Sequence, residues 1–337
     1  MKKGFPVVDA AINAPQGSIA SQTVQRASVL SRFRTGDNAF RTLTFAAALF
    51  VLVLLGAIIG SLVIGAWPAL SKFGFSFLTS NRWSVNQEIF GALSPIYGTL
   101  MTSFLAMLIA VPVGLGIAIF LTELCPMSLR RPIGIAIELL AGIPSIIYGI
   151  WGFFVLAPFL KESVMPGLIA LFAPIPLLNQ LFAGPGYNAS MLTASLILAI
   201  MVLPFITAIS RDVFLTVPPV LKEAAFGVGC TTWEVVSNIV LPFTRVGVIG
   251  GVMLGLGRAL GETMAVTFVI GNSHNISASL LDPATTISAT IANEFQESDG
   301  MYTSALLALG LLLFVITFCV LTASRLMLMR LERKAGG

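Results

Sequence analysis

Residues 246–271 read VGVIGGVMLGLGRALGETMAVTFVIG, an apolar run in which Arg258 and Glu262 are the only charged side chains. A helix of this length crosses the hydrocarbon core of a bilayer, which is about 30 Å thick. A charge near the centre of that core costs about 2.5–3.5 kcal/mol on insertion scales, so charged side chains there face protein or water. The run therefore predicts a membrane-spanning helix with one face turned away from lipid.

The composition of the whole chain agrees with a membrane protein. Of its 337 residues, 56% are hydrophobic and 10% are charged, and the mean hydropathy is +0.94. Six segments are apolar and long enough to span a bilayer: 40–66, 95–121, 133–159, 190–210, 246–271 and 303–325. We expect an all-α integral membrane protein with six transmembrane helices, whose surroundings are the lipid bilayer rather than a nucleic acid.

One further apolar segment, 163–189, contains four prolines. Each proline removes a backbone hydrogen bond, and the pieces between them are too short to cross a membrane. We therefore expect an interfacial or re-entrant hairpin, and the sequence leaves both alternatives open. A seventh span at this place would also move every later loop to the other side of the membrane.

The basic residues indicate how the chain is oriented, because lysine and arginine collect in cytoplasmic loops. With six spans, fifteen of the 19 Lys and Arg residues fall on one side of the membrane. They lie in 1–41, 122–132, 211–245 and 325–334. The opposite loop 272–302 carries Asp282, Glu294, Glu297 and Asp299 but no Lys or Arg. We expect both termini to be cytoplasmic.

These segments predict one membrane domain with two tails. The transmembrane domain covers 40–326 and includes the cytoplasmic segment 211–245. The N-terminal tail, 1–39, is polar and poor in aromatic and branched side chains, so we expect it to be flexible. A basic cytoplasmic tail, 327–337, follows the last span.

A helical wheel of the fifth span places glycines and both charges on one face. The glycines are Gly247, Gly250, Gly251, Gly255, Gly257 and Gly261. The other face carries Val248, Ile249, Val252, Met253, Leu256 and Leu260. Because small residues allow helices to approach closely, we expect the glycine face to contact protein and the other face to contact lipid.

Arg258 and Glu262 are four residues apart, the spacing at which side chains of one helix form an ion pair. Such a pair either holds helices together or lines a pathway, in which Arg258 receives an anion and Glu262 limits how long it stays. Apolar packing would hold helices together without burying charge, which favours the pathway. Pro112, Pro144 and Pro204 inside three spans also favour transport, because opened backbone needs a cavity or protein partners.

We assign no binding or catalytic role to Glu138, His274 or the three cysteines. Glu138 lies near the cytoplasmic end of the third expected span, where we expect it to pair with a nearby arginine. His274 is the only histidine, so we assign no metal site. Cys125, Cys230 and Cys319 are far apart and odd in number, which indicates packing residues rather than disulfides.

The cytoplasmic segment 211–245 carries the most specific pattern. It has a Pro-Pro start, a short helical stretch, glycines, a second helical stretch from about Thr232 and a closing Pro242. The pattern predicts a compact knob of two short helices. Its residues match the EAA loop of binding-protein-dependent ABC importer permeases, which it resembles in the residues Glu223, Ala224, Ala225, Gly229, Ile239, Leu241 and Pro242. The resemblance implies that this loop docks on an ATP-binding subunit.

Three further stretches resemble the phosphate-specific permeases of that family: ELLAGIPSIIYGIWG (138–152), LTVPPVLKEAAFGVG (215–229) and GLGRALGETMAVT (255–267). The long polar N-terminus is closer to the PstC branch than to the PstA branch. The resemblance implies a permease subunit of the bacterial inner membrane that moves inorganic phosphate from a periplasmic binding protein into the cytoplasm. It also associates Arg258 and Glu262 with the passage of phosphate.

The resemblance also implies the partners. The sequence has no GxxxxGK[ST] loop, so we expect no cofactor in this chain, and ATP hydrolysis in a separate subunit. The implied partners are a second permease similar to PstA, an ATPase dimer similar to PstB and a phosphate-binding protein similar to PstS. Two alternatives stay open: a permease for another oxyanion such as sulfate or molybdate, and an independent anion channel or proton-coupled carrier.

Overall fold

The structure is a computed structural model that describes the backbone of residues 16–335 and the side chains of residues 37–330 except residue 177. The chain divides into two compact units at residues 61 and 62. The described backbone is helical and contains only two isolated β-bridges, Ser84 with Ile89 and Gly271 with Ala284. The expected all-α class is confirmed.

Six helical stretches of the described chain are long and apolar enough to cross a membrane, as expected. They are Asp37–Phe73, Leu93–Leu124, Ser145–Phe172, Met191–Phe214, Thr232–Leu260 and Gly300–Arg330. Four of them match the expected spans at the first, second, fourth and sixth positions. The third and fifth spans differ from expectation, and in both cases a proline is the reason.

The first and last spans continue beyond the apolar residues. Helix α1 runs over Gln16–Phe73, so much of the expected N-terminal tail is part of this helix, and residues 1–15 lie outside the described chain. Helix α15 runs over Gly300–Ala335 and includes most of the expected C-terminal tail, of which residues 336–337 are not described. No backbone feature marks the tail boundaries expected at 39 and 327.

The third span begins later than expected and includes part of the expected hairpin. Helix α4 (Met127–Ala141) is separate from it, because Pro144 ends the first stretch and caps α5 (Ser145–Trp151), where the span begins. The span then continues through two further α-helical pieces and two π-helical turns to Phe172. The hairpin expected over 163–189 is therefore wrong for its first part: Pro166 lies in α7 (Met165–Phe172) just after the π-helical turn η3 (Leu160–Val164), and the wider turn lets the helix continue past a residue without an amide donor.

The fifth span begins earlier than expected, because Pro242 does not end the preceding helix. Residues 232–260 form one continuous stretch made of α11 (Thr232–Val235), the π-helical turn η4 (Val236–Val240) and α12 (Leu241–Leu260). Pro242 lies in the first turn of α12, directly after the π-helical turn. A wider turn adjusts the hydrogen bonding around a residue that lacks an amide donor, which lets the helix continue.

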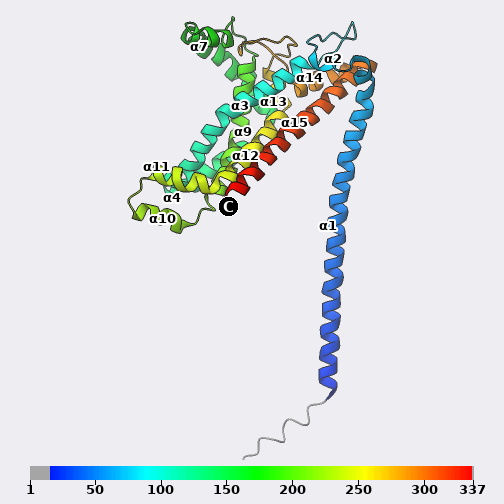
Figure 1. Ribbon diagram of the computed structural model, residues 1–337, viewed down its shortest axis with the longest axis vertical. Coiled ribbons are helices and arrows are strands. Elements are labelled where there is room, and N and C mark those ends of the chain that lie inside the picture. The colour runs from blue at the N-terminus through cyan, green and yellow to red at the C-terminus, as the bar shows by residue number, and fades with distance from the viewer. Residues whose placement is uncertain (1–15, 336–337) are drawn as a thin grey trace, which may run out of the picture. The chain divides into compact units, whose positions relative to one another are not determined.

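Four helices of the unit from residue 62 on run alongside one another: α3 (Leu93–Ile119), α9 (Met191–Phe214), α12 and α15 (Figure 1). The contact between α3 and α9 is filled by small side chains such as Ala106, Ala110, Ala194 and Ala199, all fully or almost fully buried. Thr207 of α9 also donates a hydrogen bond to a carbonyl oxygen of α3 at 3.3 Å. Small residues and interhelical hydrogen bonds are the usual means of packing helices within a membrane.

The two ends of this bundle carry different structures (Figure 1). At one end lies the knob, residues 219–235, which consists of α10 (Pro219–Gly227) and α11. At the other end lies the cap, residues 74–92 and 271–299, which includes α2 (Ser76–Thr79) and α14 (Ile287–Glu294). Helix α15 is fixed to the end of α1 beside the cap, because the Ser304 hydroxyl donates to the Gly65 carbonyl oxygen and accepts from the Ala69 amide.

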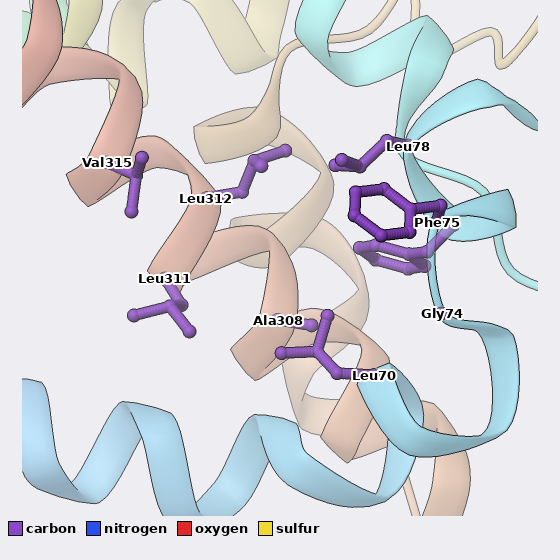
Figure 2. Close-up of a pocket in the computed structure, with 9 residues that line it drawn as sticks. Leu70, Gly74, Phe75, Leu78, Ala308, Leu311, Leu312 and Val315 are labelled. Atoms are coloured by element: carbon purple, nitrogen blue, oxygen red, sulfur yellow. The ribbon is translucent and has the colours of Figure 1, made fainter.

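A groove of about 320 Å³ lies between the end of α1, α2 and α15, and Figure 2 shows the side chains that line it. Its lining residues are Leu70, Gly74, Phe75, Phe77, Leu78, Ala308, Leu311, Leu312 and Val315. None of these residues has a polar side chain. The groove therefore offers neither charge nor hydrogen bonds to an anion, and the substrate site lies elsewhere.

The cap approaches the start of α3 so closely that only glycine fits at position 98. A Cβ atom on Gly98 would overlap the carbonyl oxygen of Thr285, which belongs to the backbone and cannot swing away. A Cβ atom on Gly116, in the same helix, would meet nothing within 4 Å. We expect Gly98→Ala to destabilise the protein by about 1–3 kcal/mol, as overpacking does, and Gly116→Ala to be nearly neutral. Thermal unfolding of both purified variants measures this, and equal stability would contradict the packing described.

Candidate functional site

The charged stretch of the fifth span lies at a break in the helix. Helix α12 ends at Leu260, and the short helix α13 (Met264–Val269) begins after Thr263. The continuous span expected over 246–271 is therefore wrong. Gly261, the weakest helix former of this segment, follows the last helical residue and still donates to the carbonyl oxygen of Gly257 at 3.3 Å. Interrupted helices are common where transporters bind ions.

Arg258 lies in the last turn of α12 with an exposed side chain. Its guanidinium carbon Cζ is 4.5 Å from the centre of the Phe205 ring of α9. A cation over an aromatic face is attracted by about 0.5–2 kcal/mol, depending on how dry the surroundings are. The carboxyl end of a helix also favours positive charge. Both effects stabilise a guanidinium at this place without a carboxylate.

Glu262 does not pair with Arg258. Among the ion pairs of the described side chains none joins these two residues, so the expected pair is wrong. The helix ends between them, and the spacing of one helical turn no longer applies. Glu262 instead accepts a hydrogen bond at 3.4 Å from the Ala265 amide at the start of α13, which leaves the Arg258 donors available.

The glycine face of α12 contacts protein in part, since Gly247, Gly251 and Gly255 lie against α9 but Gly250 has open space around it. A Cβ atom on Gly251 would overlap Ile209 of α9, and one on Gly255 would press on Val202 and Ile206. The expectation that the opposite face meets lipid is wrong in part, because Val248 and Leu260 are buried. Near the break, α12 exposes Leu254 and Arg258, and a Cβ atom on the half-buried Gly250 in line with them would meet nothing within 4 Å; these three residues form what we call the open strip.

The open strip has the chemistry of an anion pathway. Leu254 is 66% exposed and Gly250 has open space around its Cα atom, so the guanidinium of Arg258 is the only strong donor on this strip among the described side chains. A guanidinium has five N–H donors in a planar fork, which matches the oxygen pairs of a tetrahedral oxyanion. An anion that sheds water beside this strip would find its hydrogen bonds replaced at Arg258.

A second hollow lies between α13 and the cap, and sequence reasoning missed it. It measures about 430 Å³ and is lined by Phe153, Met264, Thr267, Phe268, Asn272, Ala292 and Asn293. Asn272 has a φ angle of 51°, which bends the chain sharply after α13. The only indication in the sequence is the Gly-Asn pair at 271–272, which is typical of a turn.

The knob is built as the sequence predicts, with two short helical stretches joined at a glycine. Gly229 has a φ angle of 92°, a conformation that side chains other than glycine rarely adopt. Thr231 then caps α11 and exchanges hydrogen bonds with Glu234 in a capping box. The Ala225 side chain is buried against Phe214 and Val235, while most of α10 faces outward.

Of the residues matched to the EAA loop, some form the surface of the knob and others its attachment. Glu223, Ala224 and Gly229 are exposed, as is Pro242 at the start of α12. Ala225 is buried, and Ile239 and Leu241 pack against the same apolar cluster. The knob surface also exposes large apolar side chains, with Val228 at 84% and Trp233 at 70%. Exposed apolar groups in such a cluster indicate a protein contact.

Two ion pairs connect neighbouring helices at the knob end of the bundle. Glu138 of α4 and Arg211 of α9 are 2.8 Å apart, which confirms the expected pairing of Glu138 with an arginine. Lys222 of α10 and Glu123 are 2.6 Å apart and largely buried. The sequence did not indicate this second pair, because no local pattern relates positions 123 and 222.

One carboxylate of the acidic loop 272–302, Glu294, joins several parts of the cap through hydrogen bonds. Glu294 accepts hydrogen bonds from the Trp83 ring nitrogen at 2.9 Å and from the Tyr302 hydroxyl at 2.6 Å, and lies 3.0 Å from His274 Nε2. The His274 ring stacks on Trp83 with 5.0 Å between ring centres. Asp282 likewise binds inward, to the Ser277 hydroxyl at 2.6 Å. Within the described residues, no three His, Cys, Asp or Glu side chains gather as metal ligands would.

The network around Glu294 predicts a pH-dependent stability. Burial raises the pKa of Glu294, but hydrogen bonds from His274, Tyr302 and Trp83 outweigh burial and hold the pKa below its ordinary value. A carboxyl with a lowered pKa stabilises the fold above its unfolded pKa of about 4.3, and that stability is lost as the pH falls through the folded pKa.

We expect Glu294→Gln to lower stability at pH 7 by about 1–3 kcal/mol and to weaken the loss of stability below about pH 5. Asp299→Asn, an exposed carboxyl in the same cap, serves as the control and should leave both quantities near those of the wild type. Thermal unfolding in detergent at several pH values measures the effect. Identical pH profiles for wild type and Glu294→Gln would contradict it.

Known proteins agree with this architecture. Residues 110–333 match the family model described as "Binding-protein-dependent transport system inner membrane component". The phosphate transport system permease protein PstC of Mesorhizobium japonicum is 63% identical over 326 residues, which cover 96% of this chain and all of that protein. The chain belongs to the binding-protein-dependent permease family, in its PstC group. PstC of Pasteurella multocida, 57% identical over 88% of this chain and 93% of its own length, is a further relative of this PstC-group permease.

Solved structures of ABC transporters share the fold of this PstC-group permease. A chain of a bacterial alginate ABC transporter, in complex with its alginate pentasaccharide-bound periplasmic protein, superposes with a TM-score of 0.57 at 18% identity. It covers 86% of this chain and 94% of that one. A chain of the inward-facing MetNI methionine ABC transporter gives a TM-score of 0.52 at 16% identity, covering 70% of this chain and 94% of that one. These identities support the fold alone.

Proposed function

We propose that this chain is the membrane-spanning subunit of an ATP-driven importer through which inorganic phosphate passes beside Arg258. The observation that carries the proposal is the exposed guanidinium at the helix break, on a strip of α12 that no described part of the chain covers. The PstC relatives, named as phosphate transport permeases, support phosphate as the substrate. The chain is a transport subunit and not an enzyme.

The open strip and the knob each correspond to a partner. A second permease subunit similar to PstA would face Gly250, Leu254 and Arg258 and enclose the pathway from the other side. An ATPase dimer similar to PstB would bind the exposed apolar surface of the knob around Val228 and Trp233. This dimer would hydrolyse ATP, so this chain needs no cofactor of its own.

The cap would meet a periplasmic phosphate-binding protein similar to PstS. Asp282 and Glu294 form hydrogen bonds within the cap and are not available to such a donor. The acidic side chains of loop 272–302 that it would contact are therefore Glu297 and Asp299, which are exposed. Free phosphate would be repelled by these two carboxylates, whereas a docked donor would shield them. The cap therefore suits a protein that delivers phosphate better than it suits phosphate itself.

The distribution of charge supports an orientation in the bacterial inner membrane. The described knob end carries Arg130, Arg131, Lys222 and Arg245, while the cap exposes acidic side chains. Because cytoplasmic loops are rich in lysine and arginine, the knob and both termini would be cytoplasmic and the cap periplasmic. This orientation puts the knob on the side where ATP is available.

The geometry of the break suggests how phosphate moves on. Phe205 holds the guanidinium beside the pathway without neutralising its charge, so that Arg258 attracts an anion that has lost water. Glu262 lies beyond the end of α12 on the cap side and carries a charge of the same sign as phosphate. It would oppose a second anion and keep phosphate from resting long beside Arg258. A site that releases its ion quickly suits transport better than one that holds it tightly.

Substitutions at Arg258 test the pathway. We expect Arg258→Gln to abolish phosphate uptake while the complex still assembles, because the only strong donor of the open strip is removed. Arg258→Lys keeps the charge but loses the planar fork, so it should retain part of the uptake. Glu262→Gln should slow phosphate release or alter the ATP used per phosphate. Uptake of radiolabelled phosphate, normalised to the amount of protein in the membrane, measures each effect.

A double variant decides whether the two charges are needed at all. Arg258→Leu with Glu262→Met replaces both by apolar side chains that lipid or protein accepts without cost. Normal phosphate uptake by this variant would end the pathway proposal. Competition by sulfate or molybdate in the same assay tests the other oxyanions that fit a guanidinium. The family membership leaves no support for an independent channel or a proton-coupled carrier.

The knob offers a matched pair of glycines for testing ATPase docking. Gly229→Ala strains a left-handed residue by about 1–2 kcal/mol, or roughly fivefold to thirtyfold in affinity if docking needs the present angle between α10 and α11. Gly227→Ala lies two residues earlier with a normal φ angle and open space, and should change nothing. Glu223→Gln, on the exposed side of α10, should also weaken docking. Recovery of the ATPase subunit with the purified chain measures this, and full recovery with Gly229→Ala and Glu223→Gln would refute the docking surface.

A further inference from the structure

An enclosed ion pair joins the knob to the helix that leads into the bundle. Lys222 Nζ of α10 lies 2.6 Å from an oxygen of Glu123, which belongs to the π-helical turn η1 (Phe120–Leu124) at the end of α3. Only 17% of the lysine side chain and 8% of the glutamate side chain are exposed. The two residues are 99 positions apart in the sequence, so this contact exists only in the folded chain.

This pair differs from the other lysine or arginine pairs of the described side chains. Lys72 of α1 and Glu88 of the cap are 43% and 63% exposed, and the carboxylates that bind Arg211 are at least half exposed. Exposed pairs contribute little to stability. An enclosed pair is also no better for stability than apolar packing, but it requires its partners to stay in one relative position. The enclosed pair therefore fixes the position of α10 relative to the end of α3.

The surroundings of Glu123 make η1 a firm point of attachment. Leu121 in the same turn is buried, and the Thr122 carbonyl oxygen accepts a hydrogen bond of 2.7 Å from Arg130 of α4. On the knob side, Ala225 lies in an apolar cluster that also includes Ala118 of α3. The turn is thus held by α10 on one side and by α4 on the other.

From η1 the contacts lead to the pathway residues. Helix α3 packs along α9 through buried alanines, and α9 carries Phe205, whose ring lies against the Arg258 guanidinium. Because protein interiors are densely packed, a displacement of the end of α3 moves its neighbours rather than being absorbed. A movement of α10 transmitted to Glu123 therefore reaches the helices on both sides of Arg258.

We propose that the Lys222–Glu123 pair transmits the movement of the knob to α3 and thereby couples ATP hydrolysis to phosphate movement. Lys222 and Glu123 are positioning residues in this proposal, since neither contacts the substrate. The inference rests on the proposed docking of the ATPase on the knob. It assigns a role to two residues that docking alone does not require, because both are turned away from the surface of the knob.

Charge exchange tests the proposal in the complete importer reconstituted in vesicles with the phosphate-binding protein. Lys222→Glu and Glu123→Lys each place like charges together, and the double variant restores opposite charges with the partners exchanged. We expect each single variant to retain the ATPase subunit but to move about tenfold less phosphate per ATP, within the range typical of coupling between sites. The double variant should recover most of this ratio. As a control, Asp212→Asn removes an exposed carboxylate from Arg211 while Glu138 remains as its partner, and it should leave the ratio unchanged.

Three results would overturn the proposal. A normal ratio of phosphate to ATP in both single variants would mean that the pair transmits nothing. Loss of the ATPase subunit would mean that it supports docking instead, and a double variant no better than the single ones would mean that the two residues act separately. If Lys222→Glu does not accumulate, Lys222→Gln removes the cation without adding an anion and is held to the same expectations. A wild-type importer that moves no phosphate would refute the proposed function rather than this coupling.

Discussion

A polypeptide inside a membrane must satisfy its own backbone hydrogen bonds, and this constraint decides where the chain departs from a regular helix. Prolines at 166 and 242 are accommodated by π-helical turns directly before them, so the helices continue. The break at 261–263 is satisfied differently, by a backbone bond of Gly261 and the Glu262 carboxylate on the Ala265 amide. A charged side chain thus completes the hydrogen bonding at this break.

Charged side chains are stabilised differently within the bundle and at its knob end. Within the bundle, Arg258 relies on an aromatic ring and the end of a helix, both of which leave its donors free. At the knob end, Lys222 and Glu123 neutralise each other in a nearly closed space. Arg258 has no carboxylate partner among the described side chains and keeps its donors available. Lys222 has Glu123 within 2.6 Å, and the resulting ion pair fixes two helices to each other.

Much of the fold could be predicted from the sequence, because hydropathy and proline position act locally. Six spans, the helical start of α11 and the pairing of Glu138 all depend on neighbours in sequence or on one nearby helix. The ion pair expected between Arg258 and Glu262 failed because a glycine ended the helix between them. The role of Glu294 and the partner of Glu123 could not be predicted, since Trp83 and Lys222 reach them from 211 and 99 positions away.

The tight contact between the start of α3 and the cap has a consequence for alternating access. Gly98 lies against the Thr285 carbonyl, and the Thr99 hydroxyl accepts a hydrogen bond of 2.9 Å from the Ile287 amide. These contacts leave no space for α3 to slide or rotate separately from the cap. The cap and α3 are therefore expected to move together as one rigid body, so that a rearrangement in the transport cycle must take place at other contacts of α3 than this one.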